Sequence, residues 1–112
     1  MKIRKTNAAN DRENARIIQA PVERGLPALA SEGHWDLAVL DPPRQGASRD
    51  VLHVLTRMRI PRLLYVSCDP STLARDLGIL AGAGYRCLRI QPVDLFPQTF
   101  HVESLAVLER SA

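Results

Sequence analysis

The chain is poor in cysteine and has no long apolar run. Its 112 residues include only two cysteines, Cys68 and Cys87, with no CxxC pair and no Cys/His cluster, so a metal site has no support. No apolar stretch approaches the ~20 residues of a membrane-spanning helix, and the first residues do not resemble a signal peptide. We therefore expect a cytoplasmic protein with reduced thiols, no disulfide and no membrane partner.

Lysine is scarce as well, because 13 of the 15 cationic residues are arginine. Between Arg44 and Arg89, eight arginines stand against three acidic residues, a local net charge of 8 − 3 = +5. Guanidinium groups match phosphate oxygens and stack on bases, as an RNA partner requires. Solvated surface arginines in an arginine-rich protein explain the same composition, so the charge permits an RNA partner without establishing one.

Strand and helix patterns alternate along a chain long enough for one domain, with 46% hydrophobic residues. Strands are predicted at residues 15–20, 36–40, 63–66, 85–93 and 104–108. Helices are predicted at residues 26–30, where Pro27 keeps the helix short, at 48–58 and at 70–83, while 2–13 is compatible with the end of a helix. This alternation indicates a mainly parallel α/β sheet with right-handed crossovers.

Two loops that could carry chemistry each follow a predicted strand. They are Asp41-Pro42-Pro43-Arg44 and Ser67-Cys68-Asp69-Pro70. Ligands of such sheets bind outside the carboxyl ends of the strands, so we expect both loops at one edge.

Cys68 stands where a strand gives way to a helix start, with Asp69 suited to the N-cap and Pro70 to the first helical position. A thiol beside unpaired N–H groups of a helix start is favoured as thiolate, the form that attacks carbon. Most free cysteines are instead small buried residues. This position by itself leaves both interpretations open.

A third notable segment runs from Asp94 to Glu103, with His101 two residues before Glu103 and the last strand directly after it. Taken alone, Glu103 is best explained as a solvated charge at the edge of a strand, whereas Asp41 fits a turn before proline as well as it fits a functional role. His101 is expected to pack and hydrogen-bond within its loop. Cys87, inside an alternating strand, is expected in the core.

Together these motifs resemble one family. Asp-Pro-Pro-Arg-x-Gly (41–46), Ser-Cys-Asp-Pro (67–70) and Phe-Pro-x-Thr-x-His-Val-Glu (96–103), in this order and spacing, are similar to the RNA uracil-C5 methyltransferases. Those enzymes make 5-methyluridine in tRNA and rRNA with S-adenosylmethionine. The similarity runs from about Asn7 to Arg110, nearly the whole chain.

The resemblance implies a role for four residues. Cys68 is the nucleophile that adds to uracil C6, which makes C5 reactive towards the methyl group. Glu103 is the general base that removes the C5 proton. Asp41 contacts S-adenosylmethionine near the transferred methyl, and Arg44 supports the RNA or the active-site carboxylates.

The chain also departs from the family pattern. Its six glycines form no G-x-G-x-x-G, and the acidic residue that holds the cofactor ribose is missing. The resemblance therefore implies that residues 1–112 are the C-terminal portion of a methyltransferase catalytic domain, without the N-terminal RNA-binding domain. The expected fold is a partial Rossmann-like class I methyltransferase sheet with helices on both faces, equivalent to strands 3–7 of the order 3-2-1-4-5-7-6.

Loss of strands 1 and 2 leaves the 36–40 strand as an exposed apolar edge, which proteins normally avoid. We expect one of three outcomes for this edge. The 15–20 strand moves beside the 36–40 strand, or a missing N-terminal half or another copy of the chain covers the 36–40 strand, or part of the chain is disordered.

Three functions remain in view. The first is an RNA methyltransferase acting on uridine C5 in tRNA or rRNA through a covalent Cys–C6 adduct. The alternative is a truncated, non-catalytic remnant or RNA-binding module that cannot bind cofactor alone. An amino-group methyltransferase is disfavoured, because Arg44 stands where that chemistry usually has an aromatic residue and Cys68 has no role in it.

Overall fold

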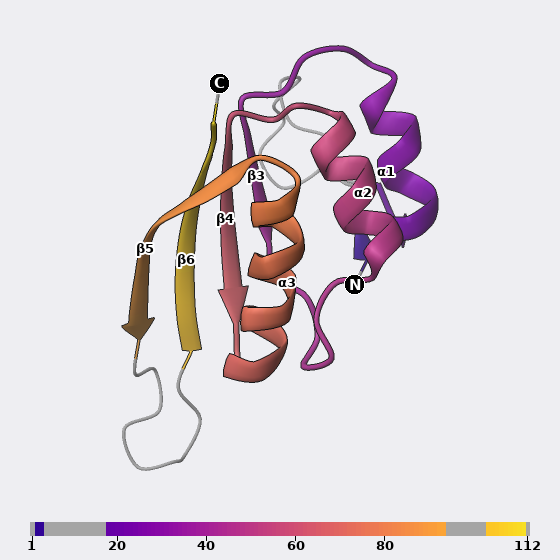
Figure 1. The fold of residues 1–112 in the computed structure, drawn as a ribbon. Coiled ribbons are helices and arrows are strands. Elements are labelled where there is room, and N and C mark those ends of the chain that lie inside the picture. Colours follow the sequence, from indigo (N-terminus) through magenta and orange to yellow (C-terminus); the bar gives the residue numbers. More distant parts are fainter. Residues whose placement is uncertain (1, 4–17, 94–102, 112) are drawn as a thin grey trace, which may run out of the picture.

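The computed structural model of the chain describes residues 2–3, 18–93 and 103–111, and in these ranges it contains three helices and six strands (Figure 1). The elements are β1 (Lys2–Ile3), β2 (Ala20–Pro21), α1 (Val22–Ala30), β3 (Leu37–Leu40), α2 (Arg49–Arg57), β4 (Arg62–Ser67), α3 (Pro70–Gly82), β5 (Tyr85–Val93) and β6 (Glu103–Arg110). From β3 onwards each element agrees with the prediction to within about two residues of its bounds.

The main sheet has four strands in the order β3-β4-β6-β5. These four strands correspond, in this order, to strands 4, 5, 7 and 6 of the methyltransferase sheet, and they pair contiguously as expected. The sheet is mainly parallel in strand direction, as predicted: β3 and β4 pair in parallel, and β5 runs the same way because β4 and β5 are both antiparallel to β6, which lies between them. β5 and β6 follow one another in the chain and pair as antiparallel neighbours, so β6 runs against the other three strands.

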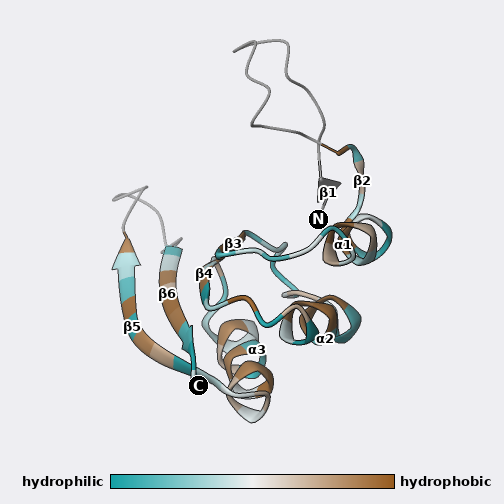
Figure 2. Ribbon diagram, turned by 90° about the horizontal axis from the view of Figure 1, so that it is seen from above, coloured by the Kyte–Doolittle hydropathy of each residue, from teal (hydrophilic) through white to brown (hydrophobic). Residues whose placement is uncertain are grey.

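Helices cover one face of this sheet in the described part of the chain. Figure 2 shows α2 and α3 on the same side, with α1 beside α2. The expected second layer of helices is not found there. Both crossovers, β3-α2-β4 and β4-α3-β5, step in the same direction across the sheet, and right-handed crossovers in one direction place their helices on one face.

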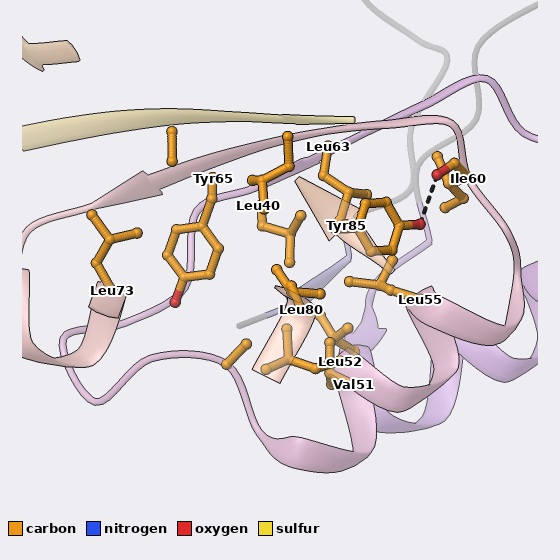
Figure 3. Close-up of a cluster of buried hydrophobic side chains, with 14 residues drawn as sticks. Leu40, Val51, Leu52, Leu55, Ile60, Leu63, Tyr65, Leu73, Leu80 and Tyr85 are labelled. Carbon is orange, nitrogen blue, oxygen red and sulfur yellow. Dashed lines mark hydrogen bonds between the residues drawn. The ribbon is translucent and has the colours of Figure 1, made fainter. Parts of the chain in front are cut away.

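The core fills the space between α2, α3 and the covered face of the sheet (Figure 3). Leu52 and Leu80 from the helices and Leu63 from β4 are 0% exposed. Full burial of such a side chain contributes about 1.5–3 kcal/mol. The hydroxyl of Tyr85 donates to the backbone oxygen of Ile60 at 2.6 Å, so this buried phenol has a partner.

The β3 edge of the sheet carries exposed apolar side chains. Leu37 and Val39 are 50% and 62% exposed, although both are large and hydrophobic. The predicted exposed apolar edge is therefore present. The alternative in which the 15–20 strand moves beside it is wrong for the described residues, because β2 pairs with β1 and lies outside the four-stranded sheet.

The N-terminal elements differ from the prediction. Lys2–Ile3 form a strand instead of a helix end, and the 15–20 strand is seen only at Ala20–Pro21, since residues 4–17 lie outside the described residues. Helix α1 begins four residues before the expected start and contains Pro27. The helix packs against α2, although a proline in a helix interior costs about 3 kcal/mol. None of the described helices is long and apolar enough to span a bilayer.

Candidate active site at the carboxyl end of the sheet

The carboxyl ends of β3 and β4 meet at one edge of the sheet, as predicted. Leu40 pairs with Tyr65 in the parallel register, so Asp41 follows β3 close to where Ser67 ends β4. Cys68 comes next and is half-buried, while Asp41 is exposed. The two loops therefore lie together, although 26 residues of sequence (42–67) separate Asp41 from Cys68.

Glu103 reaches the same edge from the other side of β4. It is the first residue of β6 and pairs with Val93 of β5. The next residue, Ser104, pairs with Ser67, the last residue of β4, so Glu103 and Cys68 each lie one residue beyond this pair. Both residues are half-buried. The structure therefore brings these two candidates to adjoining strand ends, while His101 lies outside the described residues.

The turn that carries Cys68 is held by hydrogen bonds on either side of the cysteine. The hydroxyl of Ser67 donates to the backbone oxygen of Asp69 at 2.9 Å and accepts from the Asp69 N–H at 3.1 Å. The Asp69 carboxylate accepts from the N–H groups of Ser71 and Thr72 at 2.9 and 3.3 Å, as the predicted N-cap should.

This capping changes the expected environment of Cys68. Pro70 has no N–H, and those of Ser71 and Thr72 are bonded to Asp69, so the first turn leaves the thiol none of the unpaired groups that the sequence suggested. Hydrogen bonds from the Ser71 hydroxyl and from these two N–H groups, with the nearby charge of Arg44, hold the pKa of Asp69 below its usual value.

The loop between β3 and α2 contains a tight turn. The N–H of Gly46 donates to the backbone oxygen of Pro43 at 2.8 Å, and Gly46 has a φ of +85°. A Cβ there would lie 2.5 Å from Nη2 of Arg75 and 2.7 Å from Oδ2 of Asp76. Glycine is therefore required both by the backbone conformation and by the approach of α3.

Three side chains of α3 bind the backbone of this loop. Thr72 Oγ1 donates to the Arg44 oxygen at 2.9 Å, and Arg75 Nη2 donates to the Gln45 oxygen at 2.7 Å. Asp76 Oδ2 accepts from the Ala47 N–H at 2.9 Å. Sequence reasoning missed these residues, because their partners are backbone groups 28 to 30 residues away.

Asp76 is fully buried and has several donors. Besides Ala47, it accepts from the hydroxyl of Tyr65, and its other oxygen accepts from Arg75 Nε at 3.1 Å. Burial and the bond to Asp76 raise the pKa of Tyr65 far above its ordinary value. The carboxylate is thus compensated by hydrogen bonds and one arginine, as a buried charge must be.

Arg44 and Cys87 are both exposed. For Cys87 this corrects the expectation of a core residue: β5 is an edge strand, and in it only the first residue, Tyr85, is buried. Both cysteines are free thiols. In the described part of the chain no group of three or more His, Cys, Asp or Glu side chains could hold a metal ion.

Two hollows of the described surface lie beside the loop and the first two helices. One of about 500 Å³ is lined by residues of the loop together with Glu23, Arg49 and Arg75. The other, of about 620 Å³, lies between α1 and α2. Neither of these two hollows is lined by Asp41, Cys68 or Glu103, so both are separate from the candidate site.

The sheet has the strand order β3-β4-β6-β5, and the candidate residues Asp41 and Cys68 follow the carboxyl ends of its parallel strands β3 and β4. This arrangement is that of part of a Rossmann-like methyltransferase fold. Comparison with known families agrees. The family model described as tRNA (uracil-5-)-methyltransferase matches residues 31–111, and the chain belongs to that family.

Curated relatives are similar along almost the whole chain. An uncharacterized RNA methyltransferase of Caldanaerobacter subterraneus is 44% identical over 107 residues, which are 95% of this chain and 24% of the relative. One of Geobacter sulfurreducens is 50% identical, covering 90% of this chain and 22% of the relative. The chain thus spans about a quarter of the length of these relatives and matches their C-terminal part.

A solved structure is similar in fold. It is the tRNA (uracil-54, C5)-methyltransferase of Pyrococcus abyssi in complex with S-adenosyl-L-homocysteine. The match has a TM-score of 0.60 and 38% sequence identity, and covers 70% of this chain and 20% of that chain.

Proposed function

We propose that the chain is the C-terminal catalytic part of an RNA methyltransferase that methylates C5 of uridine in tRNA or rRNA. The observation that carries this proposal is the strand register, in which Glu103 and Cys68 each adjoin the pair Ser104–Ser67, at the same sheet edge as the exposed Asp41. A nucleophile and a base at one strand edge are the two groups that the reaction needs. A tRNA or rRNA substrate fits a cytoplasmic location.

In this mechanism the thiolate of Cys68 adds to C6 of uracil, and the electrons of the C5–C6 double bond move towards the C4 carbonyl. C5 then becomes the nucleophile that receives the methyl group. S-adenosylmethionine supplies that methyl group when it is bound. Glu103 removes the C5 proton, the double bond re-forms and the bond between C6 and the Cys68 sulfur breaks.

The described residues fit one side of the cofactor. Asp41 offers an exposed carboxylate at the end of a parallel strand, which suits a cationic sulfonium group. Neither hollow beside the loop is lined by Asp41, and the sequence has no G-x-G-x-x-G, so the rest of the cofactor needs residues outside this chain. Arg44, exposed beside Asp69, is placed to bind an RNA phosphate.

We place the missing contacts in the preceding part of a longer protein. Relatives are about four times as long as this chain, and β3 exposes its edge together with Leu37 and Val39. A further strand and its helices would cover that edge and complete the sheet. The alternative is that a second copy of this chain covers the edge of β3 by self-association.

A non-catalytic RNA-binding module is the second candidate. The eight arginines between Arg44 and Arg89 are all exposed, which suits contact with an RNA backbone. RNA binding alone needs neither Cys68 nor Glu103. Formation of a covalent adduct with RNA therefore distinguishes the methyltransferase from the RNA-binding module.

The test uses two preparations: the 112-residue chain, and the same chain joined behind the preceding part of the Geobacter sulfurreducens relative, here called the joined protein. Each is titrated calorimetrically with S-adenosylmethionine and then incubated with RNA containing 5-fluorouridine. Fluorine at C5 cannot be removed as a proton, so an adduct that survives denaturation should accumulate.

We expect the joined protein to form the adduct, and Cys68→Ser to abolish it. Cys87→Ser is the matched control, because Cys87 is the other free thiol and is exposed. An adduct that persists in Cys68→Ser, or a joined protein that binds cofactor and RNA without forming an adduct, would contradict the proposal. RNA binding without an adduct supports the second candidate.

A further inference from the structure

The buried carboxylate of Asp76 has no part in the proposed chemistry, yet it binds the loop that carries Asp41 and Arg44. Asp76 is 0% exposed, and one of its oxygens accepts from both Tyr65 of β4 and the N–H of Ala47. A buried carboxylate is costly unless its bonds are complete. Its placement therefore ties the loop after β3 to β4 and α3.

Thr72, Arg75 and Asp76 stand at i, i+3 and i+4 and share one face of α3. We name them the α3 clamp. Their partners are the backbone oxygens of Arg44 and Gln45 and the N–H of Ala47, at 2.9, 2.7 and 2.9 Å. The clamp thus holds three of four consecutive loop residues by their backbone.

Each side of the clamp carries one part of the candidate site. The loop holds Asp41 and Arg44, while α3 starts two residues after Cys68. The bond from Thr72 to the Arg44 oxygen joins the arginine directly to the first turn of this helix. Gly46 lets the loop approach so closely, because a Cβ there would meet Arg75 and Asp76.

We propose that Thr72, Arg75 and Asp76 are positioning residues that fix Arg44 and Asp41 relative to Cys68 for the methylation reaction. This inference rests on the proposed function. The three side chains bind backbone groups of the loop and in this way set its position. Misplacement of a reacting group by about 1 Å can cost about 10²-fold in rate.

Thr72→Val is the sharpest variant, since it removes the hydroxyl and keeps the size of the side chain. Thr56→Val is its matched control: Thr56 is also half-buried, and its hydroxyl donates to a backbone oxygen three residues earlier, that of His53, at 2.8 Å. Thr72→Ser restores the hydroxyl and should restore function. Asp76→Asn, which keeps the shape but removes the charge, is the second probe.

Two measurements test the clamp. In the 112-residue chain, hydrogen exchange of the Gly46 and Ala47 amides should be faster in Thr72→Val and Asp76→Asn than in Thr56→Val. In the joined protein, the rate of adduct formation with 5-fluorouridine RNA should fall by about 10-fold or more in Thr72→Val at saturating RNA and cofactor, and recover in Thr72→Ser.

The outcomes separate the two proposals. Unchanged amide exchange overturns the clamp, and faster exchange with an adduct rate equal to that of Thr56→Val overturns its positioning role. If the unmodified joined protein forms no adduct, the proposed function fails, and the positioning role for that reaction fails with it. In that case amide exchange still decides whether the clamp orders the loop.

Discussion

Glu103 and Cys68 each adjoin the pair Ser104–Ser67, Glu103 as the first residue of β6 and Cys68 as the residue that follows β4. The antiparallel register between these strands produces this relationship, although 34 residues lie between the two side chains in the sequence. Any shift of the register by one residue would move Glu103 to the other face of the sheet. The pairing of these two strands therefore decides whether the two candidate residues come to the same edge of the sheet.

Substitution Glu103→Gln should slow turnover on uridine RNA by about 10²–10⁴-fold, because an amide cannot accept the C5 proton. The covalent adduct should accumulate on RNA with ordinary uridine, as seen on denaturing gels. Glu109→Gln is the control, since Glu109 lies on the same strand and face and pairs with Arg86. Equal turnover of the two variants would remove Glu103 from the mechanism.

Gly46→Ala should destabilise the chain by about 1–3 kcal/mol, because its φ of +85° is strained for alanine and the methyl group meets Arg75 and Asp76. Gly78→Ala should instead be neutral or stabilise by up to about 1 kcal/mol, since Gly78 lies inside α3 with no atom within 4 Å of the added Cβ. Urea unfolding of both variants measures the contrast. Equal effects would mean that the turn is not held as described.

Alkaline pH should destabilise the fold through Tyr65. Its pKa is raised on folding, so the folded protein keeps a proton that the unfolded chain loses near pH 10.0. The stabilisation is complete below pH 10.0 and is lost as the pH rises above it, by about 1.4 kcal/mol per pH unit. Tyr65→Phe should show a shallower fall in the free energy of unfolding by urea between about pH 9 and 11. An unchanged slope would contradict the buried bond to Asp76.

The edge of β3 should be protected only when a partner covers it. We expect the backbone amides of β3 that point away from β4 to exchange faster in the 112-residue chain than in the joined protein. Light scattering at several concentrations tests the competing self-association. Protection that grows with the concentration of the short chain would favour a second copy as the cover.

Sequence patterns predicted the core of the fold from β3 onwards, because each of these elements combines a clear apolar period with a strong end signal. Asp69 and Pro70 mark the start of α3, and Ser48 caps α2 with a bond to the Val51 N–H at 3.2 Å. The N-terminal elements were not predicted correctly, since two-residue strands have no period and Pro27 looked incompatible with a longer helix.

The sequence by itself determined the chemistry available to this protein: a cysteine between a strand and a capped helix, an Asp-Pro-Pro-Arg loop and a glutamate before the last strand. These are local patterns, and local residues encode them. Only the tertiary structure decided that Glu103 and Cys68 adjoin the same strand pair, that Cys87 is exposed and that Asp76 holds the loop of Arg44. Those relationships depend on strand register and on bonds to distant backbone groups, which have no signature in the sequence.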